Sequence, residues 1–155
     1  CWGHRYRNGT GVYAHIGDNA GEMGDNLVAV NLGPNFVPKQ VTCGHAHVCA
    51  LGQQGSVKCW GYSGNGRLGD GVSSIQDIGD APSEMGAALM AVNLGTGRKA
   101  ISVQAGAGHT CAVLDNNKIK CWGWNGHGQL GQGHRSDMGN STFTLGDNLP
   151  YTEIE

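Results

Sequence analysis

The sequence GHAHVCALGQQGSVKCWGYSGNGRLGDG, from Gly44 to Gly71, returns as GAGHTCAVLDNNKIKCWGWNGHGQLGQG, from Gly106 to Gly133, after 62 residues. In both copies His-x-Cys, Cys-Trp-Gly and Gly-x-Leu-Gly-x-Gly follow one another at equal spacing. A third Cys-Trp-Gly stands at residues 1–3, where the loop that follows is degenerate. Self-similarity at a period near 60 is typical of repeat proteins, in which each copy is one supersecondary unit.

Each full copy is predicted to contain a β-hairpin. The turn lies within Leu51–Val57 in one copy and within Val113–Ile119 in the other. Position 55 is Gly and its equivalent, 117, is Asn, the residues that best tolerate the left-handed conformation ending a short hairpin loop. Glycine makes up 28 of 155 residues and charged residues only 14%, which disfavours helices. Short strands and turns without intervening helical segments predict an all-β fold.

The string read from Gly44 to Gly71, and again from Gly106 to Gly133, resembles the regulator of chromosome condensation repeat. The resemblance implies blades of a β-propeller, a fold of about seven blades in that family. We expect one propeller-like unit with a partial first repeat (1–40), a second repeat (41–102) and a truncated third repeat (103–155). About two and a half blades cannot close a ring, for which four is the usual minimum, so a partial or open propeller is predicted.

The six cysteines are explained by the repeat. Cys49 and Cys59 are ten residues apart across the predicted hairpin, and so are Cys111 and Cys121. The register places each pair on adjacent strands, where Cα separations of about 4.5–5.5 Å fit a disulfide. We therefore predict these two disulfides and an oxidising compartment, extracellular or at the cell surface, for what would be an extracellular-type member of the family. The alternative is that the thiols are free and buried as small apolar groups.

Two cysteines have no counterpart. The repeat would place the partner of Cys1 about ten residues before it, and Cys43 aligns with Ala105. These two are expected to pair with each other or with residues outside the chain.

A metal site was weighed because Cys43, His45, His47 and Cys49 alternate along the chain. On one straight strand these four residues would span roughly 20 Å, too far for a single zinc ion to reach them all. We therefore expect no metal site. His47 and His109 are expected to be hydrogen-bonded within their own blades.

Two N-glycosylation sequons, Asn8-Gly9-Thr10 and Asn140-Ser141-Thr142, lie in loops after a Cys-Trp-Gly strand. In an oxidising compartment both asparagines are predicted glycan acceptors. The tryptophans of the repeated motif are interpreted as packing residues rather than as the tryptophan cluster of a light sensor.

Composition and motifs limit the function. The net charge of −2 without a basic block speaks against nucleic-acid binding, and the absence of a run of 18 apolar residues speaks against membrane insertion. No hydrolase, metalloprotease or P-loop motif occurs, so neither enzymatic activity nor a cofactor is expected. Asp18, Glu22 and Asp25 match no calcium loop and stay unassigned.

The prediction is a non-enzymatic extracellular structural or scaffold repeat protein, a building unit of a larger surface or filamentous assembly. Its partners would be copies of itself or further blades of the same chain. The first alternative is a propeller that presents its loops to a protein or glycan partner, since loops on rigid blades carry recognition. The second is the family's nuclear role, nucleotide exchange on a small GTPase, against which the paired cysteines and the slightly acidic balance speak.

Overall fold

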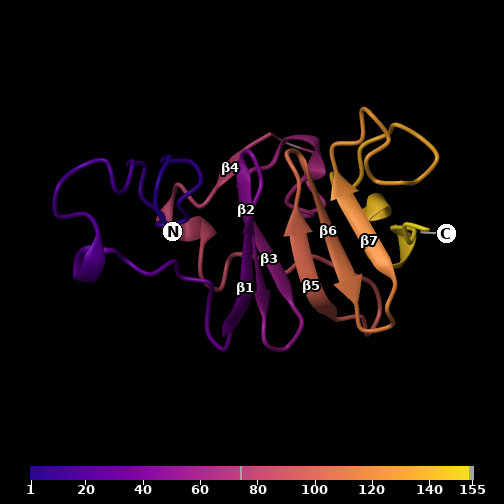
Figure 1. The fold of residues 1–155 in the computed structure, drawn as a ribbon, viewed down its shortest axis with the longest axis horizontal. Coiled ribbons are helices and arrows are strands. Elements are labelled where there is room, and N and C mark those ends of the chain that lie inside the picture. Colours follow the sequence, from indigo (N-terminus) through magenta and orange to yellow (C-terminus); the bar gives the residue numbers. More distant parts are fainter. Residues whose placement is uncertain (74, 154–155) are drawn as a thin grey trace.

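The computed structural model describes residues 1–73 and 75–153 (Figure 1). Within them the strands form two antiparallel sheets, with strand orders β1-β2-β3-β4 and β5-β6-β7. The strands of the first sheet are β1 (Pro38–Cys43), β2 (His47–Gly52), β3 (Val57–Tyr62) and β4 (Asp77–Ile78); those of the second are β5 (Ala100–Ala105), β6 (His109–Leu114) and β7 (Ile119–Gly123). Short 3₁₀ turns are η1 (Gly24–Asn26), η2 (Gly64–Gly66), η3 (Pro82–Glu84), η4 (Thr142–Thr144) and η5 (Gly146–Asn148). The predicted all-β fold is confirmed.

The two hairpins form as their turn residues predict. Gly55 has φ +86° and its equivalent Asn117 has φ +61°, so both adopt the left-handed conformation. In the first hairpin the Gly52 N–H donates to Ser56 O at 2.8 Å, and in the second the Leu114 N–H donates to Lys118 O at 2.8 Å. The turn chemistry fixes the register, which sets Cys49 opposite Cys59 and Cys111 opposite Cys121.

The sheets stack as neighbouring blades, and we call the side of each sheet that faces later residues its forward face and the other its rear face. On β1 the Gln40 side chain donates to Val103 O at 2.6 Å, and the Thr42 hydroxyl accepts from the Ala105 N–H at 3.0 Å. Because side chains alternate along a strand, Val41 and Cys43 occupy the rear face. Polar contacts to backbone groups thus fix how the two blades meet.

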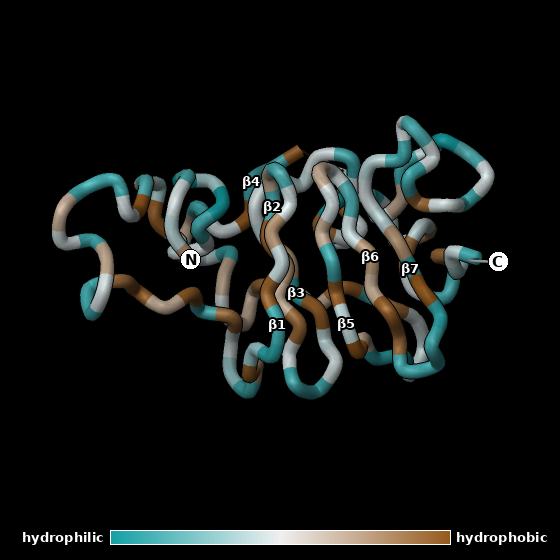
Figure 2. Tube along the Cα trace, in the orientation of Figure 1, coloured by the Kyte–Doolittle hydropathy of each residue, from teal (hydrophilic) through white to brown (hydrophobic). Residues whose placement is uncertain are grey.

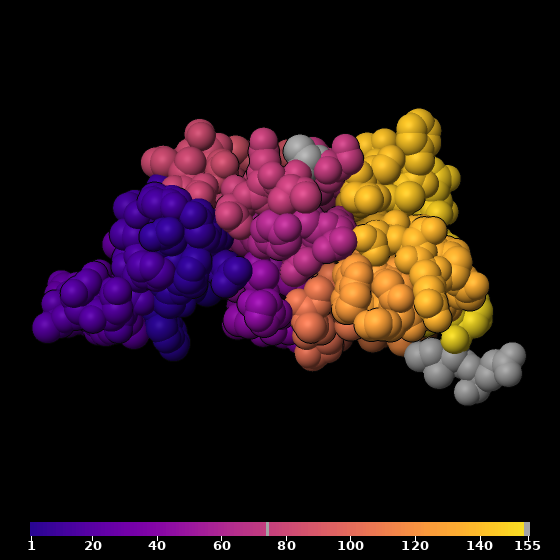
Figure 3. Space-filling model, turned by 90° about the horizontal axis from the view of Figure 1, so that it is seen from above, coloured from indigo at the N-terminus to yellow at the C-terminus, as the bar shows by residue number. Residues whose placement is uncertain are grey.

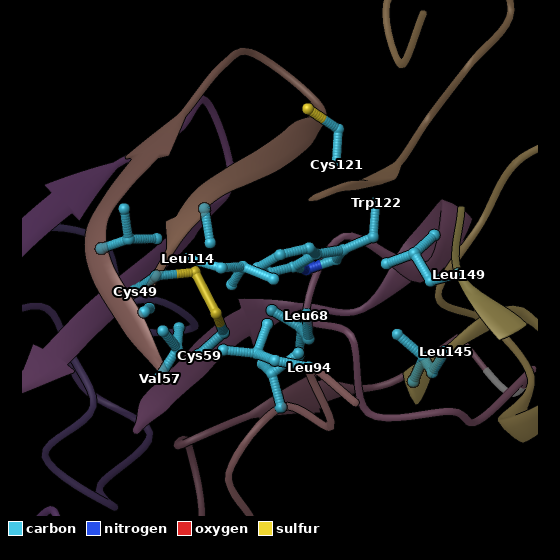
Figure 4. Packing of buried hydrophobic residues seen from close by; sticks show 14 of the residues in the cluster. Cys49, Val57, Cys59, Leu68, Leu94, Leu114, Cys121, Trp122, Leu145 and Leu149 are labelled. Carbon is cyan, nitrogen blue, oxygen red and sulfur yellow. A yellow bond between two sulfur atoms is a disulfide. The ribbon is translucent and has the colours of Figure 1, made fainter. Parts of the chain in front are cut away.

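The main core lies between the two sheets (Figure 4). The disulfide-bonded Cys49 and Cys59 and the side chain of Val57 come from the first sheet, and Leu114 and Trp122 from the second. A smaller cluster around Trp60 lies on the rear face of the first sheet under the N-terminal segment (residues 1–37). Apolar residues follow the strands, whereas the hairpin turns are polar (Figure 2).

The N-terminal segment supplies only the outer part of a blade. Gly3 bridges Ile16 as Gly61 bridges Ile78 in the first sheet. Its Trp2 is 66% exposed, whereas Trp60 is 1% exposed and the third copy of this residue is fully buried. The packing interpretation therefore holds for two of the three motif tryptophans but not for Trp2. The fold is an open array of propeller-type blades, as predicted.

Two details differ from expectation. Cys43 ends β1 and His47 begins β2, so the alternating Cys and His residues straddle a turn and do not share one straight strand. The His47 ring is hydrogen-bonded to Thr110 of the neighbouring sheet at 2.8 Å, not within its own blade. The His-x-Cys motif therefore serves contact between blades, a role that sequence spacing inside one repeat cannot reveal.

Candidate interaction rim

The cysteine pairs staple the two hairpins. The Sγ atoms are 2.12 Å apart in Cys49–Cys59 and 2.09 Å apart in Cys111–Cys121, with Cα atoms 4.1 Å apart in each pair. Cys1 and Cys43 are free thiols in the structure rather than a pair. In the described residues no helix has the length and apolar character needed to cross a membrane.

The loops that follow the Cys-Trp-Gly strands lie along one rim of the molecule. They comprise residues 4–15, 62–76 and 124–137, and we call them together the loop rim. Figure 3 views the molecule from this side and shows the N-terminal, central and C-terminal parts side by side. The two hairpin turns lie at the opposite rim (Figure 1).

Buried asparagines hold the outer two loops. Asn125 is fully buried, donates to His134 O at 2.9 Å and to Ser136 O at 3.0 Å, and accepts from the Leu130 N–H at 3.0 Å. Asn8 is also fully buried and donates to Ala14 O at 2.8 Å. Satisfied polar networks of this kind rigidify the loops that they span.

A carboxylate joins the second and third loops. Asp137 accepts from the Asn65 side chain at 2.8 Å and from the Asn125 N–H at 2.7 Å. Arg67, which is mostly buried, donates to Gly64 O at 2.7 Å and lies over the Tyr62 ring with Cζ 4.8 Å from the centroid. The rim is therefore a continuous surface rather than three independent loops.

The first loop carries an exposed aromatic cluster around a guanidinium. The Cζ atom of Arg5 lies 5.0 Å from the Tyr6 ring centroid and 4.5 Å from the Tyr13 centroid. The two tyrosine rings meet edge to face, and their hydroxyls are hydrogen-bonded. Tyr13 is 55% exposed, and His4 packs edge-on against His15. Tyr and Arg are the residue types, with Trp, that are enriched at binding hot spots. Sequence comparison missed this cluster because it lies in the degenerate copy.

The repeated carboxylates have a structural role. Glu22 accepts the backbone N–H groups of Gly17 and Asn19, and Glu84 accepts those of Gly79 and Ala81. The hydrogen bonds from Asn19 are the main cause of a lowered pKa for the Glu22 carboxyl. These residues close turns, which accounts for the repeated Gly-Asp and Glu-Met-Gly pattern.

A repeated lysine was also missed. Lys58 donates to Leu32 O at 2.7 Å and to Gly86 O at 3.2 Å, and Lys120 donates to Leu94 O at 3.1 Å and to Gly146 O at 2.6 Å. Burial lowers the pKa of both ammonium groups. The identical Val/Ile-Lys-Cys-Trp-Gly context of the two lysines was the available signal. Each lysine ties two loop segments together below the rim.

His47 sits between the blades in a specific protonation state. The Thr110 hydroxyl donates to Arg67 O at 3.1 Å, so it accepts from the protonated Nε2 of His47. The Nδ1 atom is buried without a partner among the described residues. Burial, helped by the charges of Arg67 and His109, lowers the pKa of His47 from 6.5 to about 4.

We expect His47 to make the fold acid-sensitive. As the pH falls below 6.5 the unfolded chain binds a proton before the folded chain does. The contribution is complete above about pH 6.5, declines by about 3 kcal/mol between pH 6.5 and 4, and levels off below. Urea unfolding at stepped pH measures this loss, and His47→Gln should flatten it. His127→Gln, at an exposed rim histidine, is the control; an unchanged slope in His47→Gln would contradict the prediction.

The two sequons differ in accessibility. The side-chain nitrogen of Asn8 is buried and hydrogen-bonded, so a glycan there requires the loop to open. Asn140 lies next to η4, is partly exposed, and its side chain makes no hydrogen bond within the described residues. We therefore expect Asn140 to be the occupied site of native material. Intact mass before and after glycosidase treatment checks this, and an unmodified native mass would refute it.

Comparison with known proteins follows from this geometry. The family model for the regulator of chromosome condensation (RCC1) repeat matches residues 39–67 and 100–129. The ultraviolet-B receptor UVR8 of Arabidopsis thaliana is 35% identical over 99 residues, which cover 64% of this chain and 20% of the receptor. The probable E3 ubiquitin-protein ligase HERC6 of Homo sapiens is 30% identical over 126 residues, covering 81% of this chain and 11% of the ligase. The chain thus spans a fifth or less of these relatives.

Solved structures show the same fold. Human WBSCR16 superposes with a TM-score of 0.61 at 18% identity, covering 95% of this chain and 33% of that protein. Prp20p of Saccharomyces cerevisiae superposes with a TM-score of 0.57 at 19% identity, covering 94% and 32%. The family match falls on the two hairpins, and the structural matches extend over nearly the whole chain. This chain therefore consists of RCC1 repeats folded as blades of an RCC1-type β-propeller.

Proposed function

We propose that the chain is a non-catalytic scaffold of an extracellular or cell-surface compartment, in which disulfide-stapled blades present the loop rim to a protein partner. The observation that carries this proposal is the exposed Arg5, Tyr6 and Tyr13 cluster on a rim held by buried polar groups. Such a surface loses little side-chain entropy on binding, because its aromatic groups are already packed against one another.

The proposed compartment rests on the disulfides. Both are set by hairpin register, and Cys49 and Cys59 are only 0% and 4% exposed. Disulfides persist where thiols are not kept reduced. The coarse function is supported by the structure of Prp20p, which was described with its binding to Gsp1p and histones. Protein binding is thus a use to which this fold is put elsewhere, while the net charge of −2 argues against a nucleic-acid surface here.

A second candidate is a building unit of a larger extracellular assembly, such as a surface layer or filament. The observation that favours it is the state of the two end faces. Val41 on the rear face of the first sheet is 58% exposed, whereas its equivalent Val103 is fully buried between the blades. Further blades of the same polypeptide or neighbouring copies would cover such a face. Sedimentation of native material distinguishes the candidates: a compact monomer of 16.2 kDa that binds through the rim would leave only the first.

The rim proposal is tested with the double variant Tyr6→Ala/Tyr13→Ala. Immobilised wild-type chain is expected to capture a protein partner from the secreted fraction of its native source. Loss of two hot-spot residues should weaken that capture by about 30-fold or more. The matched control, Gln53→Ala/Gln54→Ala, changes exposed residues at the opposite rim and should bind as wild type does. Equal capture by both variants would show that the rim is not the binding surface.

A further inference from the structure

A cavity of about 510 Å³ lies between the N-terminal segment and the first sheet. Its lining includes the free thiols of Cys1 and Cys43, the side chain of Arg7, and the apolar residues Val41 and Val48. Cys43 is exposed, and Val41 is 58% exposed. An apolar strand face and two thiols thus meet at one opening.

The equivalent place between the two sheets is filled. There Val103 is fully buried under the β1–β2 hairpin, and the Sγ of Cys49 lies 3.8 Å from the Thr110 hydroxyl. By the 62-residue repeat, Val41 corresponds to Val103 and Val48 to Thr110. The interface between the sheets is therefore a template for what fits the cavity: a hairpin that brings a cysteine against Val48.

The strand edge beside the cavity is also unpaired. Gly3 exchanges backbone hydrogen bonds with Ile16 at 2.7 and 3.1 Å, which uses one edge of this strand. On the other edge, the Tyr62 N–H of the first sheet donates to Ala46 O at 2.8 Å. The N–H of His4, at the corresponding position, has no backbone acceptor in residues 1–73 and 75–153.

We propose that this cavity is the docking site of a two-stranded β-hairpin that pairs antiparallel with Cys1–Gly3 and carries a cysteine opposite Cys1. The register is the one that places Cys49 opposite Cys59. Cys1 already packs against the cluster of Val48 and Trp60, so a disulfide there would face the first sheet as Cys49–Cys59 faces the second. This inference rests on the assembly candidate of the proposed function and specifies its partner.

The covalent step is a thiol–disulfide exchange. The partner cysteine arrives as a mixed disulfide with a small thiol such as glutathione. The Cys1 thiolate attacks the partner sulfur, the bond between the two proteins forms, and the bond to glutathione breaks. Glutathione leaves as a thiolate and takes up the proton that Cys1 released, so no external oxidant is consumed. Docking selects Cys1, whereas accessibility alone would select the exposed Cys43.

The test uses a synthetic peptide of residues 100–114 from this chain, which spans β5 and β6 and contains Cys111 as its single cysteine. The peptide is supplied as its glutathione mixed disulfide to the 155-residue chain, and adducts are mapped by mass spectrometry. We expect attachment at Cys1 to exceed attachment at Cys43 by at least about tenfold, the factor that about 1.4 kcal/mol of docking free energy produces. A scrambled peptide with the same modified cysteine should prefer the more exposed Cys43.

Two variants sharpen the result. Val41→Asp places a charge on the exposed docking face without disturbing the buried core, and it should abolish the preference for Cys1. Cys43→Ser should leave the attachment at Cys1 unchanged. Preferential attachment of the ordered peptide at Cys43, or equal attachment of the ordered and scrambled peptides at Cys1, would overturn the proposal. Neither outcome touches the loop rim, so capture by the rim would survive it; association of native material without this selectivity would retain the assembly candidate alone.

Discussion

Replacing Trp122 with alanine is expected to lower the free energy of unfolding by about 3–5 kcal/mol, as for other fully buried aromatic side chains. Trp122 is fully buried between the sheets, where its ring packs with Leu114 and Leu149 (Figure 4). It also faces Gly69 of the preceding loop, where an added Cβ would lie 2.8 Å from the indole nitrogen. Truncation leaves a cavity at the junction of the blades, which chemical denaturation measures directly.

The chain provides its own matched control for this change. Trp2 occupies the same motif position but is 66% exposed, so Trp2→Ala should alter the free energy of unfolding by no more than about 0.5 kcal/mol. A loss in Trp2→Ala as large as that in Trp122→Ala would show that the N-terminal segment is packed in solution. That result would contradict the open rear face.

Removing one disulfide with Cys49→Ala/Cys59→Ala is expected to cost about 3–5 kcal/mol. Closing a loop between residues ten apart restricts the unfolded chain by about 3 kcal/mol in the chain-entropy description. The loss of two sulfur atoms from the buried centre of the interface adds a cavity cost. Denaturant unfolding without reductant gives the total.

The second disulfide separates these two contributions. Cys111→Ala/Cys121→Ala opens a loop of the same length, but Cys111 is partly exposed on the forward face of the second sheet. Its cost should therefore be nearer to the loop contribution alone. Equal losses in the two double variants would show that burial of Cys49–Cys59 adds nothing. Wild-type stability that is insensitive to reductant at full unfolding would argue against disulfides in solution.

Much of the fold was predictable because it is local and repeated. The left-handed turn residues Gly55 and Asn117 fix hairpin register, and register alone sets the cysteine partners. The rim residues were predictable only as loops. Arg5, Tyr6 and Tyr13 come together through the path of a degenerate loop, which no other copy in the chain repeats.

The sequence by itself determined the all-β class, the two hairpins and the pairing of four cysteines, since each depends on residues within about ten positions of one another. Only the tertiary structure decided which copies of a repeated residue are buried. Trp2 and Trp122 share one motif, and Val41 and Val103 share another, yet one of each pair is exposed. Likewise His47 finds its partner, Thr110, in the neighbouring blade. Burial and such contacts depend on which blade lies next to a residue, and a repeat gives every copy the same local signal.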